Sequence, residues 1–300
     1  MVALRRLLGG AVTLLIALLL LGLAAEGLGD PAARQLGPEA DEAARAALRA
    51  ELGLDAPLWQ RLFLPILALL KGDLGQSVWL HRPVAALVGE VLPVTLRLAA
   101  AAWPIGLSLG ITLGLLLASS RPGWARLPLL LLSMPGFVAA VLAVQIFAAG
   151  LGWFPAAGYQ GWYSLVLPGA LLGGALGVKL GLILQDRLRS LAQEPFMTFA
   201  RARSLGRLRM LLAYRLLPAA GLLARFGALH AGYLLGGTLV VEMVFGLPGL
   251  GRLAVLALTN RDLALLRGCM LAAGTGFLLA RFAAEALQNW LDPRPAASQT

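Results

Sequence analysis

Charged residues are scarce in this sequence. Asp, Glu, Lys and Arg make up 13% of it, whereas 59% of its residues are hydrophobic. A typical soluble domain has about 25% charged and about 45–50% apolar residues. The apolar residues here also form long uncharged blocks, which the core of a water-soluble fold does not need. A block of about 20 apolar residues can cross the hydrocarbon layer of a bilayer, so the sequence predicts an all-α integral membrane protein.

Cysteine and histidine are rare as well. The one cysteine, Cys269, can form neither an internal disulfide nor a Cys-rich metal site. The two histidines, His81 and His230, lie far apart in the sequence. No paired nucleophile and base, and no cluster of metal ligands, occurs within the apolar blocks. These shortages argue against an intramembrane enzyme, and we expect no metal and no catalytic residue in this chain.

A phosphate-binding loop of the form Gly-x-x-x-x-Gly-Lys-Ser/Thr is also absent from the sequence. We therefore expect no ATP and no other cofactor in this chain. The net charge of +10 does not indicate a nucleic-acid partner. Most of the excess comes from arginines in short segments between apolar blocks, where the positive-inside rule places them.

Six apolar blocks predict six transmembrane helices. Glycine and alanine are frequent in them, and small residues allow membrane helices to pack closely. The first block follows Arg5 and Arg6, as in a signal peptide, but it is long for one and further blocks follow. We therefore expect an uncleaved first helix. The predicted spans are residues 7–25, 94–118, 127–150, 166–184, 221–245 and 263–287.

The arginines alternate between the two sides of these spans. They gather before the first span, between the second and third, between the fourth and fifth, and after the sixth. Segment 26–93 has nine acidic residues against six basic ones, and loop 151–165 has no charge. Both termini should therefore face the cytoplasm. The predicted organisation is a first helix in 1–25, an extracytoplasmic segment over 26–93, a five-helix core over 94–290 with a cytoplasmic loop over 187–217, and a cytoplasmic tail over 291–300.

Two helices are expected in the outer segment. Residues 39–52 have alanines on one side and charges on the other, as in an amphipathic helix. Residues 58–70 are apolar but too short to span, and Pro65 interrupts them. We expect this second piece to lie along the membrane surface or to pack on the helix bundle.

The cytoplasmic loop has an unusual composition. Pro195 suits the first turn of a helix, and a break is expected near residues 204–206, followed by a second helix into the fifth span. Exposed aromatics beside arginines are typical of a protein contact, but a helix lying on lipid headgroups would have the same composition. The face expected at helical spacing is formed by Phe196, Phe199, Ala200 and Arg203.

Polar side chains within spans are costly and usually face the bundle interior or a water path. Lys179 and His230 fall at similar depths, in the inner halves of the fourth and fifth spans. We hypothesise that they line a translocation path, together with Gln145 and Glu242. Two alternatives remain open: Lys179 could extend its side chain to the inner interface, and His230 could be a satisfied interior histidine.

The loop from residue 196 to 204 resembles that of the permeases of binding-protein-dependent ABC importers. The peptide and nickel branch of that family has the form Y-V-R-T-A-R-A-K-G. Three positions match outright and one is conservative, while the family glycine is replaced by Ser204, with Gly206 two residues later. This departure leaves the bend of the loop open. The resemblance implies an ATPase-coupling loop formed by Phe196, Met197, Phe199, Ala200, Arg201, Ala202, Arg203, Ser204 and Gly206.

Further matches to this family cover almost the whole chain. Gly72 to Gly75, followed by Ser77, is a short one, and the most specific is the segment 236–262. Glu242 stands where the family has a Glu before an outer turn, so the resemblance implies that it braces this turn. The outer turn is formed by Pro248, Gly249, Gly251 and Arg252, with Arg252 as a candidate partner of the Glu242 carboxylate.

The resemblance also implies the partners. Such permeases pair with a second, homologous permease around one pore in the bacterial inner membrane. Two cytoplasmic ATP-binding subunits hold ATP and Mg, and an extracytoplasmic substrate-binding protein delivers the cargo. The loop helix is expected to seat in a cleft of one ATP-binding subunit, so that ATP-driven closure there opens the pore outward.

The cargo is less well defined than the class. We favour di- and oligopeptides, and nickel or a nickel chelate is a close alternative, because residues 153–162 and His230 resemble the nickel permeases. A permeant metal would need several His or Cys ligands, however. An ion-coupled secondary transporter would need acidic residues near mid-membrane and an inverted repeat, neither of which is clear. A non-transporting scaffold would not account for the loop signature.

Overall fold

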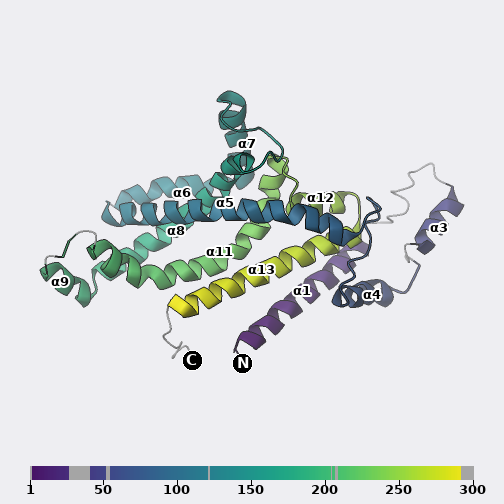
Figure 1. The fold of residues 1–300 in the computed structure, drawn as a ribbon, viewed down its shortest axis with the longest axis horizontal. Coiled ribbons are helices and arrows are strands. Elements are labelled where there is room, and N and C mark those ends of the chain that lie inside the picture. Colours follow the sequence, from purple (N-terminus) through teal and green to yellow (C-terminus); the bar gives the residue numbers. More distant parts are fainter. Residues whose placement is uncertain are drawn as a thin grey trace. The chain divides into compact units, whose positions relative to one another are not determined.

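The computed structural model describes residues 2–26, 41–51, 55–120, 122–203, 205–206 and 209–291 (Figure 1). Within these ranges the chain is helical apart from turns and one isolated bridge between Gln76 and Pro83. The all-α prediction is therefore confirmed for the described residues. The chain forms two compact units, of which the first contains residues 1–93 and 248–278 and the second residues 94–247 and 279–300.

The first unit is built on a small apolar core. Its members come from the start of α5, from α12 and from the start of α13, because apolar residues recur at helical spacing in all three. The helices with residues in this unit are α1 (Val2–Glu26), α3 (Glu42–Glu51), α4 (Leu58–Leu70), α5 (Val84–Ser119), α12 (Leu250–Thr259) and α13 (Leu263–Leu291). The buried core consists of Val84, Leu87, Val88, Leu250, Leu253, Ala257, Leu265, Leu266 and Cys269.

Both helices expected in the outer segment are present, as α3 and α4. The expected interruption at Pro65 is wrong, because α4 continues through this residue. A proline removes one backbone hydrogen bond from a helix, but α4 packs on α1 and buries Ile66, which offsets that loss. Of the two placements expected for residues 58–70, the structure shows packing against another helix, α1.

The second unit is built mainly from α8 (Tyr163–Ala192), α11 (Leu217–Val244) and the part of α5 that follows Pro93. One of its two larger apolar cores contains residues of α5, α7, α8 and α11, and the other joins α8 to α11. Its elements are the part of α5 from Val94 on, η1 (Pro122–Ala125), α6 (Arg126–Ser133), α7 (Gly136–Ala143), the π-helix η2 (Val144–Gly150), α8 (Tyr163–Ala192), α9 (Pro195–Ala202), the π-helix η3 (Met210–Leu216), α11 (Leu217–Val244) and the end of α13.

Helices α5 and α8 approach each other along a ladder of glycines. A Cβ atom at Gly173 would lie 2.4 Å from the backbone oxygen of Ala102, and one at Gly110 would lie 2.6 Å from the side chain of Leu180. Only residues without a side chain allow this approach, as in other membrane helix pairs. The glycines recur every four residues, at Gly106, Gly110 and Gly114 on α5 and at Gly169, Gly173, Gly177 and Gly181 on α8.

Three described helices are long and apolar enough to cross a membrane: Val84–Ser119, Tyr163–Ala192 and Leu263–Ala286. The third predicted span is not one helix, because α6 ends at Ser133 and α7 begins at Gly136. Pro135 explains this break, since proline lacks an N–H and disfavours helix in the residue before it. The number of spans therefore stays a prediction.

Candidate functional site

Helix α9 is the element predicted to contact a partner, and the structure confirms that it is a short helix. Pro195 is its first residue, and the carbonyl of Glu194 accepts a hydrogen bond from the backbone N–H of Met197 at 3.0 Å. A helix can begin at a proline, because the first N–H groups of a helix have no partner within it. After Arg203, the described residues Leu205 and Gly206 are not helical, which agrees with the predicted break.

The two faces of α9 differ sharply in exposure. The Phe199 side chain is 73% exposed and that of Phe196 37%, whereas Met197 and Ala200 are only 1% and 2% exposed. The prediction that Ala200 shares the exposed face is therefore wrong. Helical spacing places Ala200 one turn after Met197, and α9 turns this side toward η3.

Two exposed arginines follow α9 in the chain. Arg203 is exposed at the end of the helix, and Arg209 is exposed just before η3. Aromatic and arginine side chains are the residues most enriched at protein contacts. Ser204 lies outside the described residues, as does the side chain of Arg201, while Gly206 is exposed and Ala202 ends the helix.

Lys179 lies on α8 and His230 on α11, and these two helices pack on each other. The His230 ring stacks on that of Phe226, with centroids 3.8 Å apart and an angle of 17° between the planes, and its Nδ1 lies 3.0 Å from the Phe226 carbonyl oxygen. The similar depth of Lys179 and His230 stays a prediction, while the two helices that hold them are in contact.

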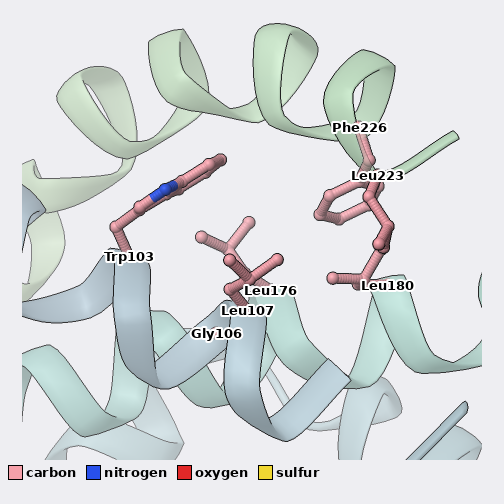
Figure 2. Close-up of a pocket in the computed structure, with 7 residues that line it drawn as sticks. All are labelled: Trp103, Gly106, Leu107, Leu176, Leu180, Leu223 and Phe226. Atoms are coloured by element: carbon pink, nitrogen blue, oxygen red, sulfur yellow. The ribbon is translucent and has the colours of Figure 1, made fainter. Parts of the chain in front are cut away.

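A small apolar hollow lies beside this pair. Figure 2 shows Trp103 and Leu107 of α5 and Leu176 and Leu180 of α8 facing Leu223 and Phe226 of α11 across it. Phe226 belongs both to the hollow and to the stack with His230. Three helices thus meet at an apolar gap, and His230 stacks on one of the residues that line it.

The other two residues of the predicted path lie elsewhere. Gln145 is exposed on η2. Glu242 is fully buried near the end of α11, and its Oε1 accepts a hydrogen bond from Thr95 Oγ1 at 2.7 Å. The structure thus places Glu242 as a buried tie between α11 and α5, which agrees with a bracing role.

The outer turn leads into α12. Its chain reverses at Gly246, where φ is +60°, and the N–H of Leu247 returns to the carbonyl of Glu242 at 2.9 Å. Pro248 is exposed and Gly249 is the extended residue before the helix, while Gly251 and Arg252 are half-buried in its first turn. The contact between Glu242 and Arg252 stays a prediction.

Sequence reasoning missed a second buried tie, between Ser77 and Asp262. Ser77 Oγ donates to Asp262 Oδ2 at 2.5 Å, the N–H of Trp79 donates to the same oxygen at 3.1 Å, and Asp262 Oδ1 caps α13 by accepting from Leu265 N–H at 2.9 Å. Arg82, five residues after Ser77, donates a hydrogen bond to Glu90, and this bond and the charge of Glu90 raise the pKa of Arg82. Both Ser77 and Asp262 belong to matched segments, but nothing in the sequence connects them.

Arg97 was also missed. It lies inside the second predicted span and is exposed, and its Nη1 donates to the Tyr159 hydroxyl at 3.0 Å. A scan of the predicted spans for every cation would have found it. Within the described ranges, no three His, Cys, Asp or Glu side chains gather closely enough to hold a metal ion.

Residues 110–296 match the family model described as "Binding-protein-dependent transport system inner membrane component". The chain belongs to this family of ABC importer permeases. It is 34% identical to the glutathione transport system permease protein GsiC of Salmonella typhimurium over 296 residues, or 97% of each chain. It is also 34% identical, over 279 residues and 89% of each chain, to a protein of Brucella abortus provisionally named a peptide transport system permease protein.

Proposed function

We propose that this permease forms part of the pore of an ABC importer for short peptides, and that α9 docks on an ATP-binding partner subunit. The observation that supports this most directly is the two-sided character of α9. Met197 and Ala200 fix the helix to its own subunit, while Phe196 and Phe199 face outward. An exposed aromatic pair on a helix anchored in this way can transmit motion from a partner to η3 and α11.

The remaining architecture follows from the family. The importer would contain a second homologous permease, two cytoplasmic subunits that bind ATP and Mg, and an extracytoplasmic substrate-binding protein. This permease would cross the bacterial inner membrane six times with both termini in the cytoplasm. The third crossing would be formed by α6, α7 and η2 across the break at Pro135.

Peptides are the cargo that the relatives favour. The names of the relatives from Salmonella typhimurium and Brucella abortus refer to glutathione and to peptides, and glutathione is itself a tripeptide. Nickel, the alternative cargo from the sequence analysis, is mentioned in neither of these two names. Lys179 and His230, beside the apolar hollow, would contact the cargo during its passage.

The docking role of α9 is best tested at Phe199, because Ala200 is buried and its replacement would disturb packing. We expect Phe199→Ala to lower peptide uptake by the complete transporter about tenfold or more, since an aromatic anchor at an interface is worth about 2 kcal/mol or more. Recovery of the variant from the membrane should be normal, because the side chain is 73% exposed.

The matched control is Phe137→Ala, which removes an exposed phenylalanine (56% exposed) from α7. Its uptake and its co-purification with the ATP-binding subunits should equal those of the wild type. Unchanged uptake and unchanged co-purification in Phe199→Ala would rule out the docking role.

A further inference from the structure

Among the residues that the structure describes, the Arg97 guanidinium has no carboxylate partner. It lies on the part of α5 that belongs to the second unit. Helix α5 is long and apolar enough to cross a membrane. The interaction of Arg97 within the described part of the chain is the hydrogen bond to the Tyr159 hydroxyl. A guanidinium has five N–H donors, so most of its donors remain available on an exposed side chain. Charges at such positions usually face a partner or a water path.

Tyr159 holds this guanidinium in place. The ring packs against the buried cluster that includes Leu98. The neighbouring Gly158, with φ at +87°, donates its N–H to the carbonyl of Phe245 at 2.9 Å. On the other side, the N–H of Gln160 donates to Ser164 Oγ at 3.0 Å. The backbone is therefore held on both sides of Tyr159, so its hydroxyl preorganises Arg97 for a further ligand.

No acidic residue in the described part of segment 94–247 pairs with Arg97, and Glu90, two turns earlier on α5, already pairs with Arg82. That segment contains three acids, Asp186, Glu194 and Glu242. The Glu242 carboxylate is fully buried and bonded to Thr95. Asp186 lies 23 residues after the start of α8 at Tyr163, which is about 34 Å along the helix, and Glu194 lies farther still. Loop 151–162, which presents Tyr159, has no charge.

We propose that Arg97, held by Tyr159, binds a carboxylate of the transported peptide. This inference rests on the proposed peptide cargo. Every unmodified peptide has a C-terminal carboxylate at neutral pH, and a guanidinium binds a carboxylate through two parallel hydrogen bonds. The site lies beside loop 151–162, which the topology assigns to the outer face, so Arg97 would receive the peptide as it leaves the binding protein.

The test compares a peptide with its C-terminal amide in proteoliposomes that contain the complete transporter. Both are supplied at concentrations that saturate the binding protein, so that differences arise at the permease. We expect Arg97→Gln to reduce uptake of the free acid about tenfold, the effect of one charge-assisted hydrogen-bonded contact, and to leave uptake of the amide unchanged. Arg97→Lys, which keeps the charge, should recover part of the loss.

The matched control is Arg281→Gln. Arg281 is also an exposed arginine in an apolar helix, but Glu285 already pairs with it at 3.1 Å. Its replacement should not change the ratio of acid to amide uptake. An equal loss of acid and amide in Arg97→Gln would overturn the inference and would indicate that Arg97 binds a lipid phosphate or the second permease. Unchanged acid uptake would overturn it too. Failure of the wild type to transport any peptide would reject the proposed function as well.

Discussion

Thr95 Oγ1 donates a hydrogen bond to Glu242 Oε1 across 2.7 Å, and both side chains are fully buried. The two residues are separated by 147 positions in the chain and join α5 to the end of α11. Leu98 of α5 and Phe245, the residue after α11, belong to one buried apolar cluster. A buried carboxylate is stable only when hydrogen bonds compensate it, so this contact fixes α11 where it enters the outer turn.

Thr95→Val should destabilise the protein. Valine preserves the shape of the side chain but removes the donor of a buried hydrogen bond, which contributes about 0.5–1.5 kcal/mol. Thermal unfolding in detergent should show a lower transition temperature. Thr259→Val is the matched control, because Thr259 is exposed and its hydroxyl donates to the Val255 carbonyl of its own helix at 2.9 Å. Equal transition temperatures for the two variants would contradict the importance of the tie.

Ser77→Ala should loosen the loop that precedes α5. The Ser77 hydroxyl donates to Asp262 and accepts from the N–H of Leu80 at 3.0 Å, so its loss removes two hydrogen bonds, each worth about 0.5–1.5 kcal/mol. We expect limited proteolysis to cleave residues 77–82 faster in this variant. Ser108→Ala, which removes an exposed hydroxyl bonded within its own helix, should be cleaved like the wild type. If Ser77→Ala resists proteolysis equally well, the loop is held by other contacts.

The sequence predicted the helices better than their contacts. Composition and apolar blocks were sufficient for an all-α fold, because membrane helices satisfy their own backbone hydrogen bonds. Helix ends were less accurate: α5 begins at Val84 and not at residue 94, since Glu90 and Pro93 do not interrupt it. The predicted span 127–150 has a break at Pro135, whereas α4 continues through Pro65. Packing against other helices decides whether a helix breaks at a proline or continues through it.

The candidate sites show the same limit. Helical spacing could identify α9 but not which side of it would be buried, so Ala200 was assigned to the wrong face. The similar depths of Lys179 and His230 could be estimated from the rise per residue. The pairing of Ser77 with Asp262 could not, because 185 residues separate them and a single sequence contains no information on such contacts.

The glycine ladder between α5 and α8 gives a prediction with a neighbouring control. Gly173→Ala should force the helices apart, because the added Cβ would lie 2.4 Å from the Ala102 backbone oxygen, and overpacking of this kind costs about 1–3 kcal/mol. Gly174→Ala should be neutral or stabilising by up to about 1 kcal/mol, since nothing lies within 4 Å of its Cβ. Thermal unfolding of the two variants measures the difference, and a Gly173→Ala variant as stable as Gly174→Ala would show that the helices can separate without cost.

Lys179 and His230 provide the test of the translocation path. Lys179→Leu and His230→Leu should each lower peptide uptake about tenfold, because an apolar side chain beside the hollow removes the polar groups that a hydrated solute would contact. Assembly of the transporter and its thermal stability should not fall, because a buried leucine side chain has no polar group that needs a hydrogen-bond partner. Lys71→Leu is the control for loss of a lysine, as Lys71 is exposed at the end of α4. Unchanged uptake in both Lys179→Leu and His230→Leu would mean that Lys179 only extends toward the inner interface and that His230 is a packing residue held by Phe226.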